Sequence, residues 1–258
     1  MNIKKIFKLI FILILILSSV YFAFEYYKNE NSAEKILYKK NSDKKISDEI
    51  DEEKTSQNLI FSEKNENNDY LEEPITNEDG ETLLIGGATN IVYYNQEDPR
   101  WGNKFYGKND VISIYGCGPT ALAMVVSSLT DNIINPEQMA KWSFENGYFC
   151  EGSGSYHNII PDGLKSFGLT TESLVQYSSE YIKQELNSGN IIVALMDEGH
   201  FTSGGHFIIL RGTTIDGKIL IADPKSLENS MTPWDADIFI DEAKYNSYAG
   251  GPLWVVKM

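Results

Sequence analysis

The sequence predicts an α+β domain over residues 89–258, preceded by a membrane segment and a polar tether. From Ile91 onward, aromatic residues, glycines and apolar runs alternate with turn signals, and the remaining length suits one domain. Patterns typical of helices come first and patterns typical of strands follow, instead of alternating with them. This order favours an α+β domain over a doubly wound parallel sheet. Hydrophobic residues make up 42% of the chain, which is enough to build a sizeable core.

Residues 1–24 have the pattern of a signal-anchor or a signal peptide. Basic residues end at Lys8, and residues 9–24 form an uncharged, mostly apolar run close to the length that crosses a bilayer. A cleavage site requires small side chains at the third and first positions before the cut, whereas a cut after Ala23 places Tyr21 at the third. We therefore expect an uncleaved single-pass anchor in the cell membrane, with the C-terminal domain outside. Secretion after cleavage is the alternative.

Residues 25–88 are expected to form a disordered acidic tether. They are dominated by Lys, Asn, Asp, Glu and Ser and show no sustained hydrophobic period. Such a stretch cannot bury enough apolar surface to offset the conformational entropy that ordering removes. Residues 25–90 carry 8 basic and 17 acidic side chains, so the tether repels itself and holds the domain away from the membrane.

Charge and cysteine content exclude several classes of protein. The formal net charge of the chain is −15, and residues 91–258 contain 11 basic and 20 acidic residues. A nucleic-acid partner is not expected, because phosphate binding needs clustered Lys and Arg. The two cysteines, Cys117 and Cys150, cannot build a disulfide scaffold or a four-sulfur zinc site. We expect no cofactor and no metal, and nothing in the sequence indicates an oligomeric state.

Hydrophobic periodicity predicts helices followed by strands in the C-terminal domain. In the first helix, apolar residues recur on one face, and Pro119 occupies the first helical position. A turn near Asp216 and Gly217 separates the last two strands. The predicted helices cover residues 119–129, 136–146 and 179–187, and the predicted strands cover residues 191–195, 207–210 and 218–222.

Cys117 is the candidate nucleophile. It lies in the sequence YGCGPT immediately before the first predicted helix, where unpaired backbone N–H groups and the helix dipole favour a thiolate. Cysteines at helix N-termini beside a cation have pKa values of about 3.5 to 7.5 and act as nucleophiles at neutral pH. The flanking glycines are expected to give a substrate room to approach. A plain helix-start cysteine without a catalytic role is the alternative.

His206 is the candidate general base, and Asp223 is its candidate partner. His206 opens one predicted strand and Asp223 closes the next. A four-residue loop over residues 213–216 would place His206 directly opposite Asp223 on one face of the hairpin. The carboxylate would then hold one ring nitrogen and leave the other for the sulfur. A two-residue turn at Asp216 and Gly217 would instead shift the register and move Asp223 out of reach.

Gln96 is the candidate oxyanion-hole donor. It lies in the sequence YYNQEDPRW, on a predicted loop that precedes the cysteine. Acyl transfer to a thiol develops negative charge on a carbonyl oxygen. A fixed amide N–H of Gln96 and the backbone N–H of Cys117 would form a suitable pair of donors. An isolated glutamine is more often structural, so Gln96 gains its interest from the other candidates.

These four motifs, in this order, resemble the papain-like cysteine peptidases of the double-glycine, bacteriocin-processing type and their stand-alone relatives. The resemblance rests on Gln96 in YYNQEDPRW, Cys117 in YGCGPTALAMV, His206 in GGHFIILRG and Asp223 in IADP, and covers residues 91–225. It implies a helix bearing the cysteine packed on a small antiparallel sheet bearing the histidine and the aspartate. It also implies the roles of oxyanion donor, nucleophile, base and orienting carboxylate, acting on a peptide or protein substrate. No P-loop or ATP-binding module is present, so cleavage coupled to export is not expected.

Several alternatives remain open at the level of sequence. Cys150 would end a nucleophilic role of Cys117 if the two formed a disulfide, and His200 is a second candidate base. A metal site of both cysteines with His200 and His206 has acceptable ligand types but lacks short paired spacings. His157 is expected to be a surface loop residue. For function, the alternatives are a catalytically silent binding or scaffold module of the same fold, and a thiol amidase or transpeptidase acting on cell-wall peptides.

Overall fold

The computed structural model of the chain describes residues 73–78 and 80–257. The predicted anchor over residues 1–24 and the tether up to residue 72 lie outside the described residues. None of the helices that the structure describes combines the length and the apolar character that a bilayer crossing needs.

The strands are short except at the centre of the main sheet. Their bounds are β1 Ile75–Thr76, β2 Thr82–Leu84, β3 Ile91–Tyr93, β4 Phe105–Tyr106, β5 Asp110–Val111, β6 Phe149–Cys150, β7 Gly154–Ser155, β8 Thr170–Ser173, β9 Ile191–Met196, β10 His206–Thr213, β11 Ile219–Ala222 and β12 Leu253–Lys257.

The helices precede the main sheet strands or connect them. Their bounds are α2 Ile112–Tyr115, α3 Cys117–Leu129, α4 Pro136–Glu145, the 3-10 helix η1 His157–Ile159, α5 Pro161–Ser166, α6 Ser179–Asn187, α7 Leu227–Ser230 and α8 Ile238–Asp241. The prediction for residues 179–187 is confirmed by α6. The strands β8 and β12 were not predicted, because β8 is short and polar and β12 follows a long irregular segment.

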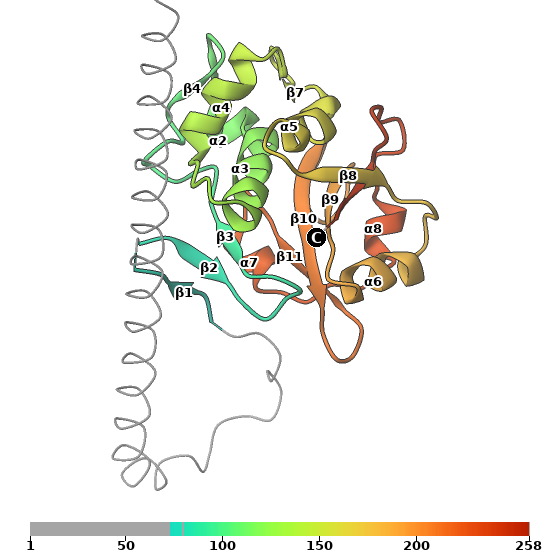
Figure 1. Ribbon diagram of the computed structural model, residues 1–258. Helices are drawn as coiled ribbons and strands as arrows, with labels where there is room; N and C mark the ends of the chain where they lie inside the picture. Colours follow the sequence, from blue (N-terminus) through green and yellow to red (C-terminus); the bar gives the residue numbers. More distant parts are fainter. Residues whose placement is uncertain (1–72, 79, 258) are drawn as a thin grey trace, which may run out of the picture. The chain divides into compact units, whose positions relative to one another are not determined.

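The main sheet has the strand order β11-β10-β9-β12-β8, and its neighbouring strands run antiparallel. Helix α3 lies on one face and α6 on the other (Figure 1). Alternate residues of β10 separate accordingly: Phe207 and Ile209 pack with α3, whereas Ile208 and Leu210 pack with α6. The α+β prediction is confirmed by this arrangement, in which the sheet is antiparallel and buried on both faces.

Two strands, β1 and β2, lie before residue 89, within the range predicted to be a disordered tether. Strands β1 and β2 pair with each other, and β2 pairs with β3. Leu84 of β2 is buried in the same core as α3. These strands gave no signal in the sequence because they are two and three residues long, too short to produce a hydrophobic period.

The hairpin of β10 and β11 has a different register from the predicted one. Thr213 pairs with Ile219, and the register shifts between Leu210 and Gly212, where Arg211 is the additional residue of a β-bulge. Beyond the bulge, Ile209 pairs with Ala222, which places Asp223 opposite Ile208 rather than opposite His206. A β-bulge leaves no clear sequence pattern, so the hydrophobic alternation of the two strands could not reveal it.

Arg211 fixes this bulge to the N-terminal hairpin. Its side chain is fully buried, and its guanidinium donates to the backbone oxygens of Ile221 at 3.0 Å and Ile85 at 2.9 Å. Its own carbonyl accepts from the backbone N–H of Ala88 at 2.9 Å. Burial lowers the pKa of Arg211 to about 10. Carbonyl oxygens in the interior therefore hold the guanidinium charge. They belong to β11 and to the segment after β2, which are distant in the sequence.

Candidate active site

Cys117 is the first residue of α3, two residues earlier than the predicted helix start. The sulfur therefore lies within the first turn, where helix N–H groups have no intrahelical acceptor. Cys117 is half-buried and reduced, and it lines a cavity of about 530 Å³. Pro119 occupies the third helical position, which also lacks an intrahelical hydrogen bond and so tolerates proline.

The glycines that flank Cys117 serve internal packing, which corrects the expectation that they give a substrate room. Both are buried. A Cβ on Gly116 would lie 2.5 Å from the carbonyl oxygen of Ile112, and a Cβ on Gly118 would lie 2.5 Å from Oγ of Ser155. Glycine at these positions allows the short α2 and the β7 segment to press against the start of α3. The two segments thereby fix the backbone that carries the sulfur.

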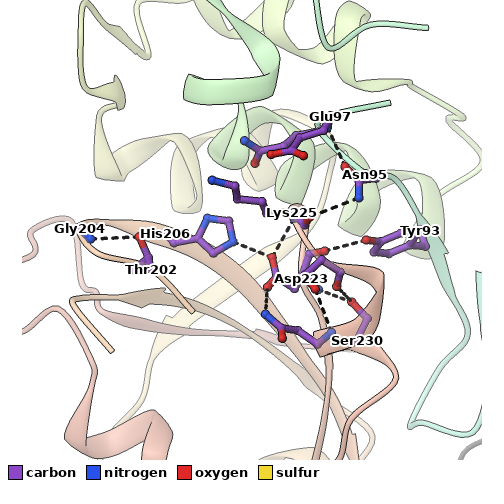
Figure 2. Close-up of polar contacts among 12 residues, drawn as sticks. Tyr93, Asn95, Glu97, Thr202, Gly204, His206, Asp223, Lys225 and Ser230 are labelled. Atoms are coloured by element: carbon purple, nitrogen blue, oxygen red, sulfur yellow. Dashed lines mark hydrogen bonds and ion pairs between the residues drawn. The ribbon is translucent and has the colours of Figure 1, made fainter. Parts of the chain in front are cut away.

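His206 and Asp223 meet at the open end of the hairpin, where β10 begins and β11 ends, as Figure 2 shows. The Nε2 atom of His206 lies 2.7 Å from Oδ1 of Asp223, and both side chains are buried. Asp223 lies opposite Ile208 and therefore points to the same face of the sheet as Ile208. His206 lies two residues before Ile208 in β10, so it points to that face as well. Without the bulge, Asp223 would lie opposite Ile209 and point to the other face of the sheet. The bulge therefore makes this contact possible.

Asp223 is held by further hydrogen bonds around its carboxylate (Figure 2). Oδ1 accepts from the backbone N–H of Lys225 at 2.8 Å, and Oδ2 accepts from the side-chain amide of Asn229 at 2.8 Å. Burial alone would raise the pKa of Asp223, but the hydrogen bond and charge of His206, together with these donors, keep it below its usual value. The carboxylate is thus ionised and fixed in orientation.

The backbone of Asp223 is fixed as well. Its N–H donates to Oγ of Ser230 at 2.8 Å, and its carbonyl accepts from the hydroxyl of Tyr93 at 3.0 Å (Figure 2). The next residue, Pro224, accepts from the backbone N–H of Gln96 at 2.7 Å. The segment after β11 is therefore tied to α7 and to the loop after β3.

His206 also interacts with Cys117, on the side of the ring away from Asp223. Burial alone would raise the pKa of the thiol, but a hydrogen bond to His206 and its positive charge bring it below the usual value. Backbone N–H groups of Phe207 and Gly118 add to this effect. For His206 burial acts in the opposite direction, yet Asp223 and Cys117 raise its pKa to about 9. Since Nε2 faces Asp223, Nδ1 is the ring nitrogen left for sulfur.

Gln96 is buried beside the turn that leads to Cys117. Its Nε2 donates to the carbonyl of Ser113 at 2.8 Å, while Oε1 is buried without a hydrogen-bond partner in the described part of the chain. A primary amide nitrogen carries two protons, so the second N–H of Gln96 remains for another acceptor. Helix α2, which contains Ser113, ends directly before Gly116 and Cys117.

The cavity beside Cys117 lies between two parts of the chain. The loop after α4 contributes one wall, and the sheet with the segment before β12 contributes the other. The lining residues are Cys117, Cys150, Ser153, Ser155, Tyr156, His157, Leu195, Gly205, Phe207, Lys244 and Tyr248. The cavity thus reaches from the sulfur to Gly205, which directly precedes His206.

Other sequence candidates lie in different places. Cys150 is a free thiol that lines the same cavity, so it is not bonded to Cys117. His157, expected on the surface, is half-buried in the cavity wall and stacks on Tyr248 with ring centroids 4.3 Å apart. His200 is half-exposed, pairs through Nδ1 with Glu242 and does not line the cavity. No group of His, Cys, Asp and Glu among residues 73–78 and 80–257 is arranged to hold a metal ion.

Several residues of the site carry no clear signal in the sequence. Asn229 and Ser230 belong to a four-residue helix, which is too short for a periodic pattern. The Ser226 side chain caps that helix by accepting from the backbone N–H of Asn229. The sequence SLEN over residues 226–229 could have indicated this helix start. Lys244 and Tyr248 lie in an irregular segment, where no sequence pattern connects them with the cysteine.

Comparisons with known proteins agree with the resemblance. The model of the Peptidase_C39 like family matches residues 88–251, a range that includes all four candidate residues. Among solved structures, one that is similar is a Bacillus anthracis protein described as a C39-like peptidase. It has a TM-score of 0.42 and 13% identity, and the match covers 64% of this chain and 94% of that chain. No curated protein matches the chain.

Proposed function

Because the chain belongs to the Peptidase_C39 like family, we propose that it is a cysteine peptidase that hydrolyses a peptide or amide bond with Cys117 as nucleophile. The observation that carries this proposal is the position of His206. Its imidazole is buried between the carboxylate of Asp223 and the sulfur of Cys117, and that sulfur opens to a cavity. Nucleophile, base and orienting group therefore occur in the order that acyl transfer needs.

The reaction begins with the thiolate of Cys117 and the imidazolium of His206. The thiolate attacks the carbonyl carbon of the scissile bond and forms a tetrahedral oxyanion. The imidazolium then gives its Nδ1 proton to the departing amine, the C–N bond breaks, and a thioester remains. His206, now neutral, takes a proton from water as the water attacks the thioester, which releases the acid and restores the starting pair. Asp223 orients the ring through Nε2 in each step.

We assign the oxyanion to the free N–H of Gln96 and the backbone N–H of Cys117. The bond to Ser113 fixes the Gln96 amide before substrate arrives, so donation needs little reorganisation. Removing one such donor lowers turnover by about 10²–10³-fold in related chemistry. Gln96→Ala should therefore lower kcat strongly with a small effect on KM, and Gln96→Glu should not restore it, because a carboxylate repels the oxyanion.

The test is labelling of the full chain with an electrophilic peptide probe, followed by mass spectrometry. We expect the probe on Cys117 in the wild type and none in Cys117→Ala. Cys150→Ala is a matched control, because it removes the other thiol of the same cavity and should still be labelled. His206→Ala should be labelled at least tenfold more slowly. Equal labelling of Cys117 with and without His206 would contradict the pairing, as would labelling confined to Cys150.

The same thioester can react with an amine in place of water. This would give transpeptidation with the same four residues, so the acceptor decides between peptidase and transpeptidase. We propose water as the acceptor, and mass spectrometry of products formed with and without a glycine-peptide amine tests this. A ligated product that dominates over the free acid would replace hydrolysis by transpeptidation.

We also propose that residues 1–24 hold the enzyme at the cell membrane with its catalytic domain outside, or direct its secretion. The support is the sequence pattern of basic residues followed by an apolar run. Fractionation of expressing cells and protease treatment of intact cells provide the test. Protein found in the soluble cytoplasmic fraction and protected from external protease would contradict it.

A further inference from the structure

The cavity beside Cys117 contains a cation that the proposed reaction does not use. Its lining residues include Lys244 and, in the described part of the chain, no Asp or Glu. The rest of the wall is aromatic, apolar or hydroxylic, apart from the thiols of Cys117 and Cys150, and it includes Leu195, Phe207 and Tyr248. A cavity of about 530 Å³ has the size of a site for a small ligand or one to two side chains.

Lys244 is held rigidly by the sheet. Its backbone N–H donates to the carbonyl of Leu195 at 2.9 Å, and the preceding residue, Ala243, bridges to Met196 in antiparallel fashion. The aliphatic stem passes Gly205, where an added Cβ would lie 3.8 Å from both Cδ and Cε of Lys244. Because Gly205 directly precedes His206, the stem of the lysine runs close to the proposed reaction centre.

The ammonium group of Lys244 keeps donors for a ligand. Its Nζ donates to Oδ1 of Asp197 at 2.7 Å, and the side chain of Asp197 is 45% exposed and does not line the cavity. An ammonium group has three donors, so this bond leaves two for a ligand. On the cavity side, burial and the positive charge of Lys244 lower the pKa of His157. That imidazole is therefore uncharged at neutral pH, which leaves Lys244 as the cation of this wall.

The rest of the protein does not attract acidic ligands. Residues 91–258 carry 11 basic and 20 acidic side chains, so long-range electrostatics repel an anionic peptide. A preference for such a peptide must therefore arise from a local contact within the cavity. Lys244 can provide that contact, because its aliphatic stem packs beside Gly205 and the carboxylate of Asp197, its ion-pair partner, is partly exposed to solvent.

We propose that this cavity is a substrate subsite for a residue bearing a carboxylate, near the scissile bond, and that Lys244 determines the specificity for it. The inference rests on the proposed function for the identity of the ligand as a peptide. It predicts that a substrate with Glu at one position is bound about tenfold more tightly than the same peptide with Gln. Lys244 touches the substrate in this account, while Asp197 only orients the ammonium.

The test measures binding to the full chain with the substitution Cys117→Ala, which prevents turnover. Fluorescein-labelled tripeptide amides carry Glu or Gln at each position in turn, with Ala elsewhere, and anisotropy gives the Kd. We expect a Glu preference of about tenfold at one position. Adding Lys244→Met, which keeps an apolar stem against Gly205, should reduce that preference to less than about twofold. Adding Lys244→Glu should reverse it, so that the Gln peptide binds more tightly than the Glu peptide.

Asp197→Asn is the matched control, because it breaks the same ion pair and leaves the cation in place. A merely structural role of the pair predicts equal losses in Asp197→Asn and Lys244→Met for every peptide. The subsite instead predicts that Asp197→Asn keeps or increases the Glu preference. Equal Kd values for Glu and Gln in the Cys117→Ala chain, absence of binding by either, or a preference kept in Lys244→Met overturns the inference. Failure of Cys117 labelling would overturn the proposed function separately, because the binding ratio does not depend on the reactivity of the sulfur.

Discussion

His206 is a buried side chain whose charged form is nevertheless favoured. Burial disfavours the imidazolium, and the carboxylate of Asp223 together with the thiolate of Cys117 outweighs that cost. The sulfur is stabilised in turn by His206 and two backbone N–H groups. The two partners therefore ionise as a pair, and pH dependence should report the pair rather than either residue alone.

Peptide hydrolysis should show a bell-shaped dependence of kcat/KM on pH. The acid limb should lie below the pKa of an ordinary thiol, about 8.5, because the pair forms as the lowered pKa of Cys117 is passed. The alkaline limb should lie near pH 9, because above it His206 loses the proton that the leaving amine needs. Asp223→Asn removes the charge that raises the pKa of His206, so the alkaline limb should move down by about one pH unit.

The control for this profile is His200→Asn, which changes a histidine outside the cavity. Its two limbs should coincide with those of the wild type. An alkaline limb that does not move in Asp223→Asn would show that the carboxylate does not act on His206, and the orienting role of Asp223 would then be wrong.

Asn229 should act as a positioning residue for Asp223. It donates to Oδ2 at 2.8 Å, on the side of the carboxylate away from the oxygen that holds His206. Asn229→Ala should lower kcat by about tenfold with little change in KM, because the carboxylate loses one fixed donor and part of its orientation. The exposed neighbour Glu228 offers a matched control on the same short helix, and Glu228→Ala should keep wild-type kinetics. A larger effect on KM than on kcat would indicate a substrate contact instead.

At the scale of elements, the β-bulge at Arg211 decides whether the hairpin can build the site. The sequence was sufficient to predict the strands and to nominate His206 and Asp223, because both lie at the ends of clear apolar runs. It was insufficient for the register, since a bulge adds one residue without changing the hydrophobic pattern. The predicted pairing of His206 with Asp223 was wrong, because Asp223 lies opposite Ile208. The two side chains still meet, since Ile208 and His206 are two residues apart and lie on the same face of the strand.

Arg211→Met should destabilise the fold. The substitution keeps much of the apolar stem but leaves the carbonyl oxygens of Ile221 and Ile85 without their donor. We expect the free energy of unfolding to fall by about 2 kcal/mol, measured by urea denaturation. Lys218→Met, on the neighbouring segment and half-exposed, is the control and should change it by less than about 0.5 kcal/mol. Equal midpoints for the two variants would contradict a role of the buried guanidinium.

At the scale of the whole molecule, the described domain includes the hairpin of β1 and β2, which the composition of residues 25–88 predicted to be part of the tether. The change in composition at Ile91 marks where apolar periodicity becomes visible, and the ordered chain begins earlier. Leu84 fills part of the core against α3, and Ile85 receives the Arg211 guanidinium. The contact between Arg211 and Ile85 joins residues 126 positions apart, which local sequence patterns cannot report.

A chain that begins at residue 73 should therefore be more stable than a chain that begins at residue 89. The shorter chain loses β1 and β2, exposes the core site of Leu84, and leaves the Arg211 guanidinium without the Ile85 carbonyl. Burial of one leucine and one charged hydrogen bond together account for about 3 kcal/mol, so urea midpoints should differ clearly. Leu84→Ala in the longer chain should reproduce about two thirds of that loss, because it removes the core contact and keeps the hydrogen bond. If both chains unfold at the same urea concentration, the hairpin adds nothing to the fold, and the domain does begin near residue 89.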